Sequence, residues 1–307
     1  MANQELRAAY AETLLELATK DERVVALEAD LSSSMSTASL KDSLGDRYIN
    51  VGIMEAQQVG VAAGLAVTGK IPFIHTFVPF ATRRVYDQVF ISLAYAQNHA
   101  IIVGSDVGIS AEMNGGTHMS FEDLALMRAI PNISIYEVSD AEQFKQILVH
   151  CYETEGLHYI RTIRKSAPEL PSIPSDLSQG MRVLAEGKEA TIVTSGILLE
   201  DALEAAKELE TEGITVNVVD LFRIKPLNEA KMLEIIGDGP VVTVDNHNVI
   251  GGIGSLMAEF VADNSPRKVA RLGVKESFGQ VGKMDYLKED YGMTSKDIIA
   301  AVKSVVG

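Results

Sequence analysis

Glu55 is the only acid in an otherwise apolar and small-residue stretch, NVGIMEAQQVGVAAGLAV, that runs from Asn50 to Val67. The stretch predicts a helix from about Glu55 to Val67, so the carboxylate stands at the start of that helix. An ionised carboxylate left in an apolar site without a partner is costly. We therefore expect Glu55 either to reach solvent or to be bound by another group.

The predicted helix also carries a face of small residues, which is formed by Ala56, Gly60, Ala63 and Gly64. Such a face lets another backbone come close, either within the domain or at a subunit interface where Glu55 is buried, and both interpretations stay open. The run GLAVTGK at 64–70 has the spacing of a phosphate-binding P-loop. Ile71 stands where that motif needs Ser or Thr, and the run ends a helix instead of beginning one, so we reject the motif.

Two aromatic residues, Phe77 and Phe80, lie where a predicted strand (71–77) meets a predicted long helix (79–97). Phenylalanine usually belongs to the core. The carboxyl ends of parallel strands are also where ligands bind in open α/β sheets. Core packing and an aromatic ligand face are therefore both open for this pair.

The stretch SDVGISAEMNGGTHMSFED at 105–123 is polar and rich in glycine. Loops of this length in compact domains are usually functional or mobile. His118 follows Gly115 and Gly116, which allow a backbone to approach a ligand, so it is a better candidate than an average histidine. A second glycine-rich segment, DNHNVIGGIGS at 245–255, has no dinucleotide-binding spacing and is interpreted as a tight turn, with His247 expected at a surface or partner contact.

Two arginine pairs come at element ends: Arg83 and Arg84 at the start of the 79–97 helix, and Arg161 and Arg164 at the end of a strand. Arginine clusters bind phosphate or carboxylate groups. For any single one of these arginines, an ion pair with the acidic surface is the preferred interpretation.

Short apolar strands alternate with helices through the chain, which indicates parallel sheets covered on both faces. We predict an α/β protein with two doubly wound domains. The predicted strands are 23–29, 48–52, 71–77, 100–105, 133–138, 157–163, 189–196, 215–221, 240–246 and 270–274. The predicted helices are the N-terminal one, 55–67, 79–97, 120–130 with Ser120 as its cap, 140–155, 198–213 and about 295–305. A proline- and serine-rich stretch separates domains at 1–165 and 183–307, with a linker at 166–182.

The 307 residues carry a net charge of −15, which argues against nucleic acid or an anionic membrane surface as partner. Cys151 is the only cysteine, so no internal disulfide is possible and a cytoplasmic location is expected. No stretch has the length and apolarity of a membrane span or a signal peptide.

Taken together, these segments resemble the C-terminal half of transketolase, and the resemblance covers nearly the whole chain. It rests on the order and spacing of EADLSSS, INVGIMEAQQVGVAAGLAVTGKIPF, TFVPFATRRVYDQV, NGGTH, LMRAIPNISIYEVSDAEQ and RTIRKSAPEL. The chain is most similar to the small subunit of split, two-chain transketolases, which act in carbohydrate metabolism. Its fold is then a pyrimidine-binding domain followed by a smaller transketolase C-terminal domain.

The resemblance implies a cofactor site for thiamine diphosphate. Glu55 matches the glutamate that shares a proton with the aminopyrimidine ring and so activates the cofactor. Phe77 and Phe80 match the aromatic residues that pack on this ring, and Ile109 matches an apolar neighbour of it. Asp30 matches an acid that reaches the cofactor across a dimer.

The resemblance also implies substrate contacts. His118 matches a histidine that contacts the reacting carbonyl or hydroxyl, and Arg164 matches the arginine that binds the acceptor phosphate. Arg7 and Ser34 match residues that assist at this phosphate, and Arg83 is a further candidate for the substrate side.

Three positions depart from the family pattern. Asn114 replaces an aspartate that reads a sugar hydroxyl, Asp106 stands where the family has a phosphate-binding histidine, and Ala56 replaces a histidine after the catalytic glutamate. An anion at position 106 repels phosphate. The departures leave cofactor activation intact and leave open a different or branched sugar phosphate or an unphosphorylated ketose.

We expect the family's metal–diphosphate motif, a Gly-Asp-Gly followed by an asparagine, to be absent from this chain. A larger subunit would then hold the diphosphate and Mg²⁺, and the active form would be a heterotetramer that transfers a two-carbon ketol unit from a ketose to an aldose. The alternatives are the β subunit of a 2-oxo acid dehydrogenase, a deoxyxylulose-phosphate-synthase-like enzyme and a non-catalytic partner subunit.

Overall fold

A computed structural model describes residues 4–167, 170–171 and 175–307. Contacts between Cα atoms divide the chain into two compact units: Met1–Val107 with Leu126–Ala167, and Gly108–Ala125 with Pro168–Gly307. The segment 108–125 thus belongs with the second unit, which the sequence did not indicate. The domain limits at 165 and 183 stay a prediction.

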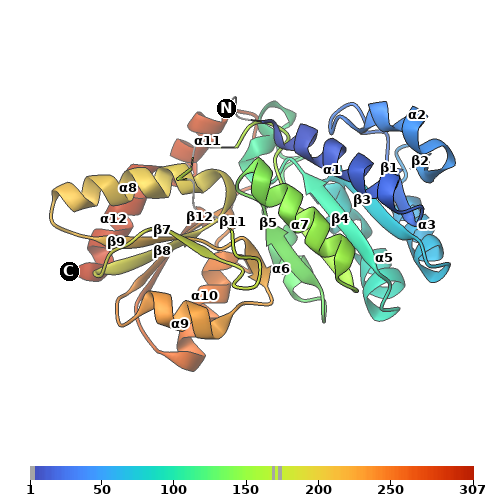
Figure 1. Cartoon of the computed structure of the whole chain (residues 1–307). Helices are drawn as coiled ribbons and strands as arrows, with labels where there is room; N and C mark the ends of the chain where they lie inside the picture. Colours follow the sequence, from blue (N-terminus) through green and yellow to red (C-terminus); the bar gives the residue numbers. More distant parts are fainter. Residues whose placement is uncertain (1–3, 168–169, 172–174) are drawn as a thin grey trace. The chain divides into compact units, whose positions relative to one another are not determined.

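The first unit is built on a parallel sheet in the strand order β5-β6-β4-β3-β1-β2 (Figure 1). The strands are β1 (Val24–Glu28), β2 (Tyr48–Asn50), β3 (Ile71–Phe77), β4 (Ala100–Ser105), β5 (Ser134–Glu137) and β6 (Leu157–Arg161). Because β1, β3, β4 and β6 are buried along their whole length, each reads as a nearly continuous apolar run.

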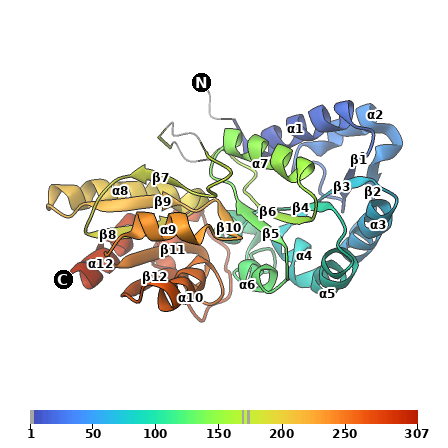
Figure 2. The ribbon, with the colours of Figure 1, turned by 60° about the horizontal axis from the view of Figure 1, so that its bottom comes forward.

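Helices cover both faces of this sheet. They are α1 (Leu6–Lys20), α2 (Lys41–Leu44), α3 (Glu55–Val67), α4 (Val78–Ala81), α5 (Tyr86–Gln88), a π-helix (Val89–Tyr95) and α7 (Ala141–Glu153), with 3₁₀ turns at Thr37–Leu40, Gly45–Arg47 and Arg83–Val85. Figure 2 shows α1 and α7 on one side of the strands and α3, α4 and α5 on the other. The predicted helix 55–67 and strands 71–77 and 100–105 are confirmed residue for residue.

The predicted long helix 79–97 is wrong, because the segment is broken into α4, a 3₁₀ turn, α5 and the π-helix. Thr82 leaves helical geometry with φ −122° and ψ −85°, and its hydroxyl donates to the Val78 carbonyl at 2.7 Å. Such back-bonding by a β-branched residue bends helices. The predicted helix 120–130 is also shorter, because α6 is Asp123–Arg128 and Ser120 is buried ahead of it instead of capping it.

The second unit has a five-stranded sheet in the order β12-β11-β8-β9-β7, in which only β7 runs antiparallel to its neighbour. The strands of this sheet are β7 (Arg182–Ala185), β8 (Ala190–Thr194), β9 (Val216–Asp220), β11 (Val241–Asn248) and β12 (Val269–Val274). The residues of this unit also include a short strand, β10 (Arg223–Lys225), that is not part of the five-stranded sheet. Its helices are α8 (Leu199–Thr211), α9 (Glu229–Ile236), α10 (Ile253–Asn264), α11 (Met284–Asp290) and α12 (Ser295–Val306), with 3₁₀ helices at Gly108–Asn114 and Gly196–Leu198.

Figure 1 shows α8 and α12 on one face of this second sheet and α9 and α10 on the other. Both units therefore have the predicted doubly wound α/β architecture, although β7, β10, α9 and α11 were not predicted. Within the described ranges, no helix has the length and apolarity needed to cross a membrane.

Candidate active site

Glu55 is the first residue of α3 and its side chain is only 4% exposed. Its Oε1 accepts a 2.6 Å hydrogen bond from Nη1 of Arg84, while no partner of Oε2 occurs among the described residues. A carboxylate at a helix N-terminus also gains from the helix dipole. The group that binds Glu55 is thus an arginine of the same chain, which leaves one carboxylate oxygen for a ligand.

Arg84 was not selected as a site residue from the sequence, because an ion pair with the acidic surface was the preferred interpretation for each arginine. The structure does give Arg84 an ion pair, but with the buried Glu55, and places it in a 3₁₀ turn. Its guanidinium carbon lies 3.7 Å from the centre of the Phe80 ring, a cation–π contact. Arg84 therefore joins the buried acid to an aromatic ring.

Phe77 and Phe80 lie together, with ring centres 6.1 Å apart and planes tilted by 36°. Phe77 is the last residue of β3 and is buried, and Phe80 is half-buried in α4. Arg164 also lies near this pair, with its guanidinium carbon 5.3 Å from the centre of the Phe77 ring. The first unit thus brings four predicted residues and Arg84 into one chain of contacts.

Arg164 and Asp106 form an ion pair, in which Nε donates to Oδ1 at 2.7 Å. Asp106 is 2% exposed, and burial raises the pKa of its carboxyl group while Arg164 opposes the rise. Residue 106 adopts a left-handed backbone with φ +60°, which aspartate and asparagine tolerate better than most residues. The acid that departs from the family pattern therefore contacts the arginine expected to bind the substrate anion.

The remaining predicted residues of the first unit lie on the strand-end loops and on neighbouring elements. The Arg7 backbone donates to the Arg164 carbonyl, and its side chain pairs with Glu5 at 2.7 Å. Asp30 is exposed with φ +61°, Ser34 is half-exposed in the loop after β1, and Arg83 is exposed beside Arg84.

Three predicted residues belong to the second unit: Ile109, Asn114 and His118. Ile109 is buried, and its backbone N–H donates to Asn246 Oδ1 at 2.9 Å. Asn114 is exposed at the end of the 3₁₀ helix, and Nδ1 of the half-exposed His118 lies 2.8 Å from the Thr117 hydroxyl. A Cβ on Gly116 would collide with the Gly279 carbonyl, so this glycine permits close packing of the His118 loop on the segment before α11.

A buried polar network in the first unit was missed from the sequence. His75 of β3 lies 2.9 Å from Glu28 Oε2 and 3.0 Å from Ser105 Oγ, and Thr37 donates to Glu28 Oε1 at 2.5 Å. All four residues are at most 1% exposed. The signal that could have found them is a polar residue inside each of three apolar strands, β1, β3 and β4. The network fixes the strand ends just ahead of Asp106.

Two expectations about glycine-rich segments are wrong, one because of the structure and one because of the sequence itself. His247 was expected at a surface or partner contact, but it is fully buried, 3.9 Å from Asp123. The expectation of a missing Gly-Asp-Gly was wrong, because Gly237-Asp238-Gly239 is present and Asn264 follows it.

The structure assigns that Gly-Asp-Gly a role in a turn. It lies between the end of α9 and the start of β11, and Arg267 donates to the carbonyls of Gly237 and Gly239 at 2.6 and 3.0 Å. Ligands of open α/β sheets bind at the carboxyl ends of strands, whereas this turn precedes a strand. Over the described ranges, no group of three or more His, Cys, Asp or Glu side chains is arranged to hold a metal ion.

The face of α3 that carries Gly60 and Gly64 is exposed, and a Cβ added at either glycine would meet no atom within 4 Å. Packing of this small-residue face on the chain's own sheet is therefore excluded for these two positions. The interpretation that remains is a surface available to another chain.

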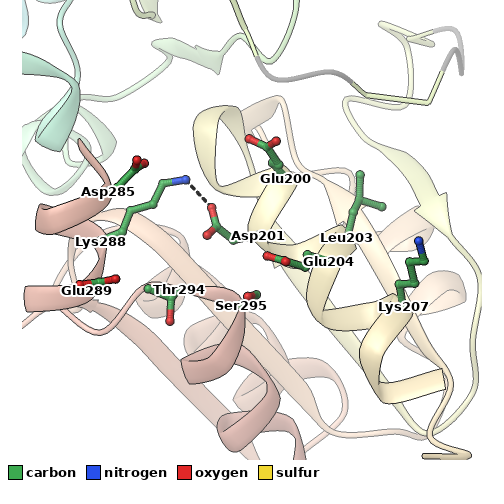
Figure 3. A pocket seen from close by; sticks show the side chains of 10 residues that line it. All are labelled: Glu200, Asp201, Leu203, Glu204, Lys207, Asp285, Lys288, Glu289, Thr294 and Ser295. Atoms are coloured by element: carbon green, nitrogen blue, oxygen red, sulfur yellow. Dashed lines mark hydrogen bonds and ion pairs between the residues drawn. The ribbon is translucent and has the colours of Figure 1, made fainter. Parts of the chain in front are cut away.

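A surface hollow of about 620 Å³ lies in the second unit between α8 and the segment from α11 to the start of α12 (Figure 3). Lys288 donates to Asp201 at 2.5 Å within it, and burial raises the pKa of Asp201 while Lys288 opposes the rise. None of the predicted site residues lines this hollow. We assign it no role in the reaction.

Comparison with known proteins decides the family. The model of the transketolase pyrimidine-binding domain matches residues 2–169, and that of the transketolase C-terminal domain matches residues 180–298. The chain belongs to the transketolase family. Thiamine diphosphate is the cofactor that this family implies.

Individual transketolases extend the match over the whole chain. The 6-deoxy-6-sulfo-D-fructose transketolase subunit SqwH of Clostridium sp. (strain MSTE9) is 46% identical over 306 residues, which cover 98% of this chain and 94% of that protein. Rat transketolase is 31% identical over 306 residues, which cover 98% of this chain but only 49% of the rat enzyme. A solved split-gene transketolase, described as an inactive β4 tetramer, is 38% identical with a TM-score of 0.87, and 99% of each chain is covered. The chain is thus similar over nearly its whole length both to transketolase subunits that are separate polypeptides and to about half of a longer transketolase.

Proposed function

We propose that this transketolase subunit supplies the aminopyrimidine side of a thiamine-diphosphate site and transfers a two-carbon ketol unit between anionic sugars, together with a larger chain. The observation that carries the proposal is Glu55. It is a buried carboxylate at a helix N-terminus, with one oxygen held by Arg84 and two phenylalanine rings in the same chain of contacts.

The residues present fit the aminopyrimidine part of the cofactor. Glu55 Oε2 is the acceptor that can share a proton with a ring nitrogen, and Phe77 and Phe80 offer aromatic faces. When bound, thiamine diphosphate supplies a carbon nucleophile and an electron sink. Arg84 holds the carboxylate in one orientation while the proton moves, and His118 is proposed to hold the reacting oxygen of the sugar.

A larger partner chain is supported by exposed apolar side chains on and next to the helix that Glu55 begins. Large apolar side chains are exposed at both ends of α3 and on the π-helix, namely Ile53 (73%), Met54 (55%), Val67 (76%), Ile91 (51%) and Tyr95 (80%). Large exposed apolar patches mark interaction sites. We propose that this surface is covered in a heterotetramer, that the larger chain holds Mg²⁺ and the diphosphate, and that Asp30 reaches the site of a neighbouring subunit.

The donor is proposed to be a ketose with an anionic end. The relative with 46% identity is named for 6-deoxy-6-sulfo-D-fructose, and Arg164 and Arg7 are the cations proposed to bind the sulfonate or phosphate. Ser34, Asn114 and Arg83 are proposed as further sugar contacts. The buried Cys151 supports a cytoplasmic location.

Calorimetric titration with thiamine diphosphate and Mg²⁺ tests the proposal. The subunit alone, a larger transketolase chain that carries the diphosphate-binding domain, and their mixture are titrated separately. We expect tight binding only by the mixture, and its loss when the subunit carries Glu55→Ala. Equal binding by the mixture with wild-type subunit and with Glu55→Ala would refute the role of Glu55. Absence of ketol transfer by a mixture that binds cofactor would favour a non-catalytic subunit.

A further inference from the structure

Asp106 is a buried acid that pairs with Arg164, the arginine proposed to bind the anionic end of the sugar. Its side chain is 3% exposed, and Oδ1 accepts from Nε of Arg164, whose own side chain is 29% exposed. Asp106 Oδ2 is also buried and has no hydrogen-bond partner in the part of the chain that the structure describes. Among the described residues, Arg164 donates a side-chain hydrogen bond only through Nε, so its two terminal nitrogens can donate to the oxygens of a ligand.

The charges near Asp106 nearly cancel. Arg164 is balanced by Asp106, and the neighbouring Arg7 is balanced by Glu5 at 2.7 Å. The other charged or titratable groups that act on Asp106 are Lys165 and His75, and His75 is itself paired with Glu28. An entering anion therefore meets two arginines, Arg164 and Arg7, that already have acidic partners, and not a cluster of uncompensated arginines.

Sugar phosphates and sugar sulfonates differ in charge at this point. Both end in a tetrahedral group with three terminal oxygens, but a phosphate monoester carries between one and two negative charges near neutral pH, with a second pKa of about 6. A sulfonate carries one negative charge at every pH used for enzymes. The second charge of phosphate is the part that a buried carboxylate beside the arginine opposes.

We propose that Asp106 tunes this subsite to singly charged tetrahedral anions, so that the enzyme prefers a sugar sulfonate to the matching sugar phosphate. The inference rests on the proposed function and identifies its substrate class. Asp106 acts here as a specificity-determining residue through Arg164. The aspartate at position 106, which stands where the family has a histidine and argues against phosphate, thus favours the recognition of a sulfonate.

The test compares two sugars that differ only in the end group, 6-deoxy-6-sulfofructose and fructose 6-phosphate. The enzyme reconstituted with the larger chain is assayed for kcat/KM on both, from pH 5.5 to 8. The variants are Asp106→Asn, which suits the left-handed backbone at this position, and Asp201→Asn as a matched control. Asp201 is likewise a buried acid paired with one cation, Lys288, but lies in the second unit outside the proposed site.

We expect wild type to favour the sulfonate at least about ten-fold at pH 7.5 and less at pH 5.5, where phosphate loses charge. Asp106→Asn should raise the phosphate-to-sulfonate ratio by about ten-fold at pH 7.5 and leave it nearly unchanged at pH 5.5. Asp201→Asn should leave the ratio at the wild-type value. A wild-type preference for phosphate at pH 7.5, or a ratio that Asp106→Asn does not alter, would overturn the inference.

Direct binding separates this inference from the proposed function. Ethanesulfonate and ethyl phosphate are titrated into the reconstituted enzyme, wild type and Asp106→Asn, and followed by calorimetry at pH 7.5. If ketol transfer fails but ethanesulfonate binds more tightly in an Asp106-dependent way, the reaction is wrong and the subsite stands. Equal binding of the two anions refutes the subsite even if ketol transfer is observed.

Discussion

Two arginine–glutamate pairs of the first unit look alike in sequence and differ in the structure. Arg84–Glu55 has a buried acid (4% exposed) and a half-exposed arginine (44%), joined at 2.6 Å. Arg161–Glu137 joins the ends of β6 and β5 at 3.1 Å, with both side chains at most 2% exposed. The first pair presents a cation and an acid to whatever binds at the surface, while the second is sealed inside the fold.

The same contrast separates two arginine–aspartate pairs. Arg164–Asp106 has an arginine that is 29% exposed, whereas Arg182–Asp220 in the second unit is 6% and 0% exposed. Removing one partner of a sealed pair leaves an uncompensated buried charge, which is strongly destabilising. The exposure of the arginine thus distinguishes a pair available for binding from a pair that holds strands together, and four substitutions test this difference.

Glu55→Ala should have the largest effect, on cofactor binding and catalysis and not on stability. We expect kcat of the reconstituted enzyme to fall by about a thousand-fold, since the acid that shares the proton is removed. The free energy of unfolding should change by less than about 1 kcal/mol, because Arg84 can turn to water. Turnover within ten-fold of wild type would place proton transfer elsewhere.

Glu137→Ala should act on stability. The buried Arg161 loses its ion pair with Glu137, so we expect the free energy of unfolding in urea to fall by about 3–5 kcal/mol. Enzyme that remains folded should keep kcat within about two-fold. A loss of activity larger than the loss of folded protein would mean that this pair also serves the site.

His158 extends the comparison to a buried group with no ion-pair partner in the part of the chain that the structure describes. It lies in β6 with Nε2 2.7 Å from the Thr154 carbonyl, and burial lowers the pKa of His158 to about 4. In the unfolded chain this histidine has an ordinary pKa of about 6.5, so the unfolded state takes up a proton at a higher pH than the folded state does. The free energy of unfolding should therefore decrease by about 3 kcal/mol as the pH falls from above 6.5 towards 4.

Urea unfolding of wild type and His158→Gln at pH 7 and pH 4.5 measures this contribution. Carboxylates titrate in both proteins, so the difference between their pH dependences isolates the histidine. Identical slopes for the two proteins would show that His158 does not carry this acid sensitivity.

Arg84→Lys should have the smallest of the four effects. Lysine keeps the charge but loses the planar fork that holds Glu55 and lies over Phe80. We expect thiamine diphosphate to bind the reconstituted enzyme about ten-fold more weakly by calorimetry. Arg23→Lys, in a surface pair with Asp21 whose arginine is 59% exposed, is the control and should bind the cofactor as wild type does.

Sequence reasoning predicted the elements whose apolar pattern is unbroken. The helix 55–67 and strands 71–77 and 100–105 have the predicted limits, and the doubly wound α/β class follows from their alternation. The prediction of one long helix over 79–97 was wrong, because hydrophobic periodicity does not show that the Thr82 hydroxyl donates a hydrogen bond to the Val78 carbonyl. Short elements such as β7 and β10 have too few residues to show a pattern.

The residues of the candidate site likewise divide into those that the sequence could predict and those that it could not. Residue types selected Glu55, Phe77 and Phe80, but the partner of Glu55 depends on a local break in the helix and could not be predicted. The His75 network was predictable in principle, since its polar residues stand in apolar strands. His247 misled because a glycine-rich turn suggests the surface, while Gly252 and Gly273 here let the backbone close over a buried imidazole and its strand.

The grouping of 108–125 with the second unit has a consequence for how the two halves of the protein can be exchanged. Gly108 and Gly116 are fitted to Asn246 and Gly279, and the Phe121 carbonyl accepts from the Asn248 backbone. A chimaera joined at the proline-rich linker would therefore combine a His118 loop from one parent with a C-terminal scaffold from another. Recombination between relatives therefore has to exchange the segment 108–125 together with the C-terminal segment from residue 168 onwards. More than forty residues that belong to the first unit separate these two segments in the sequence.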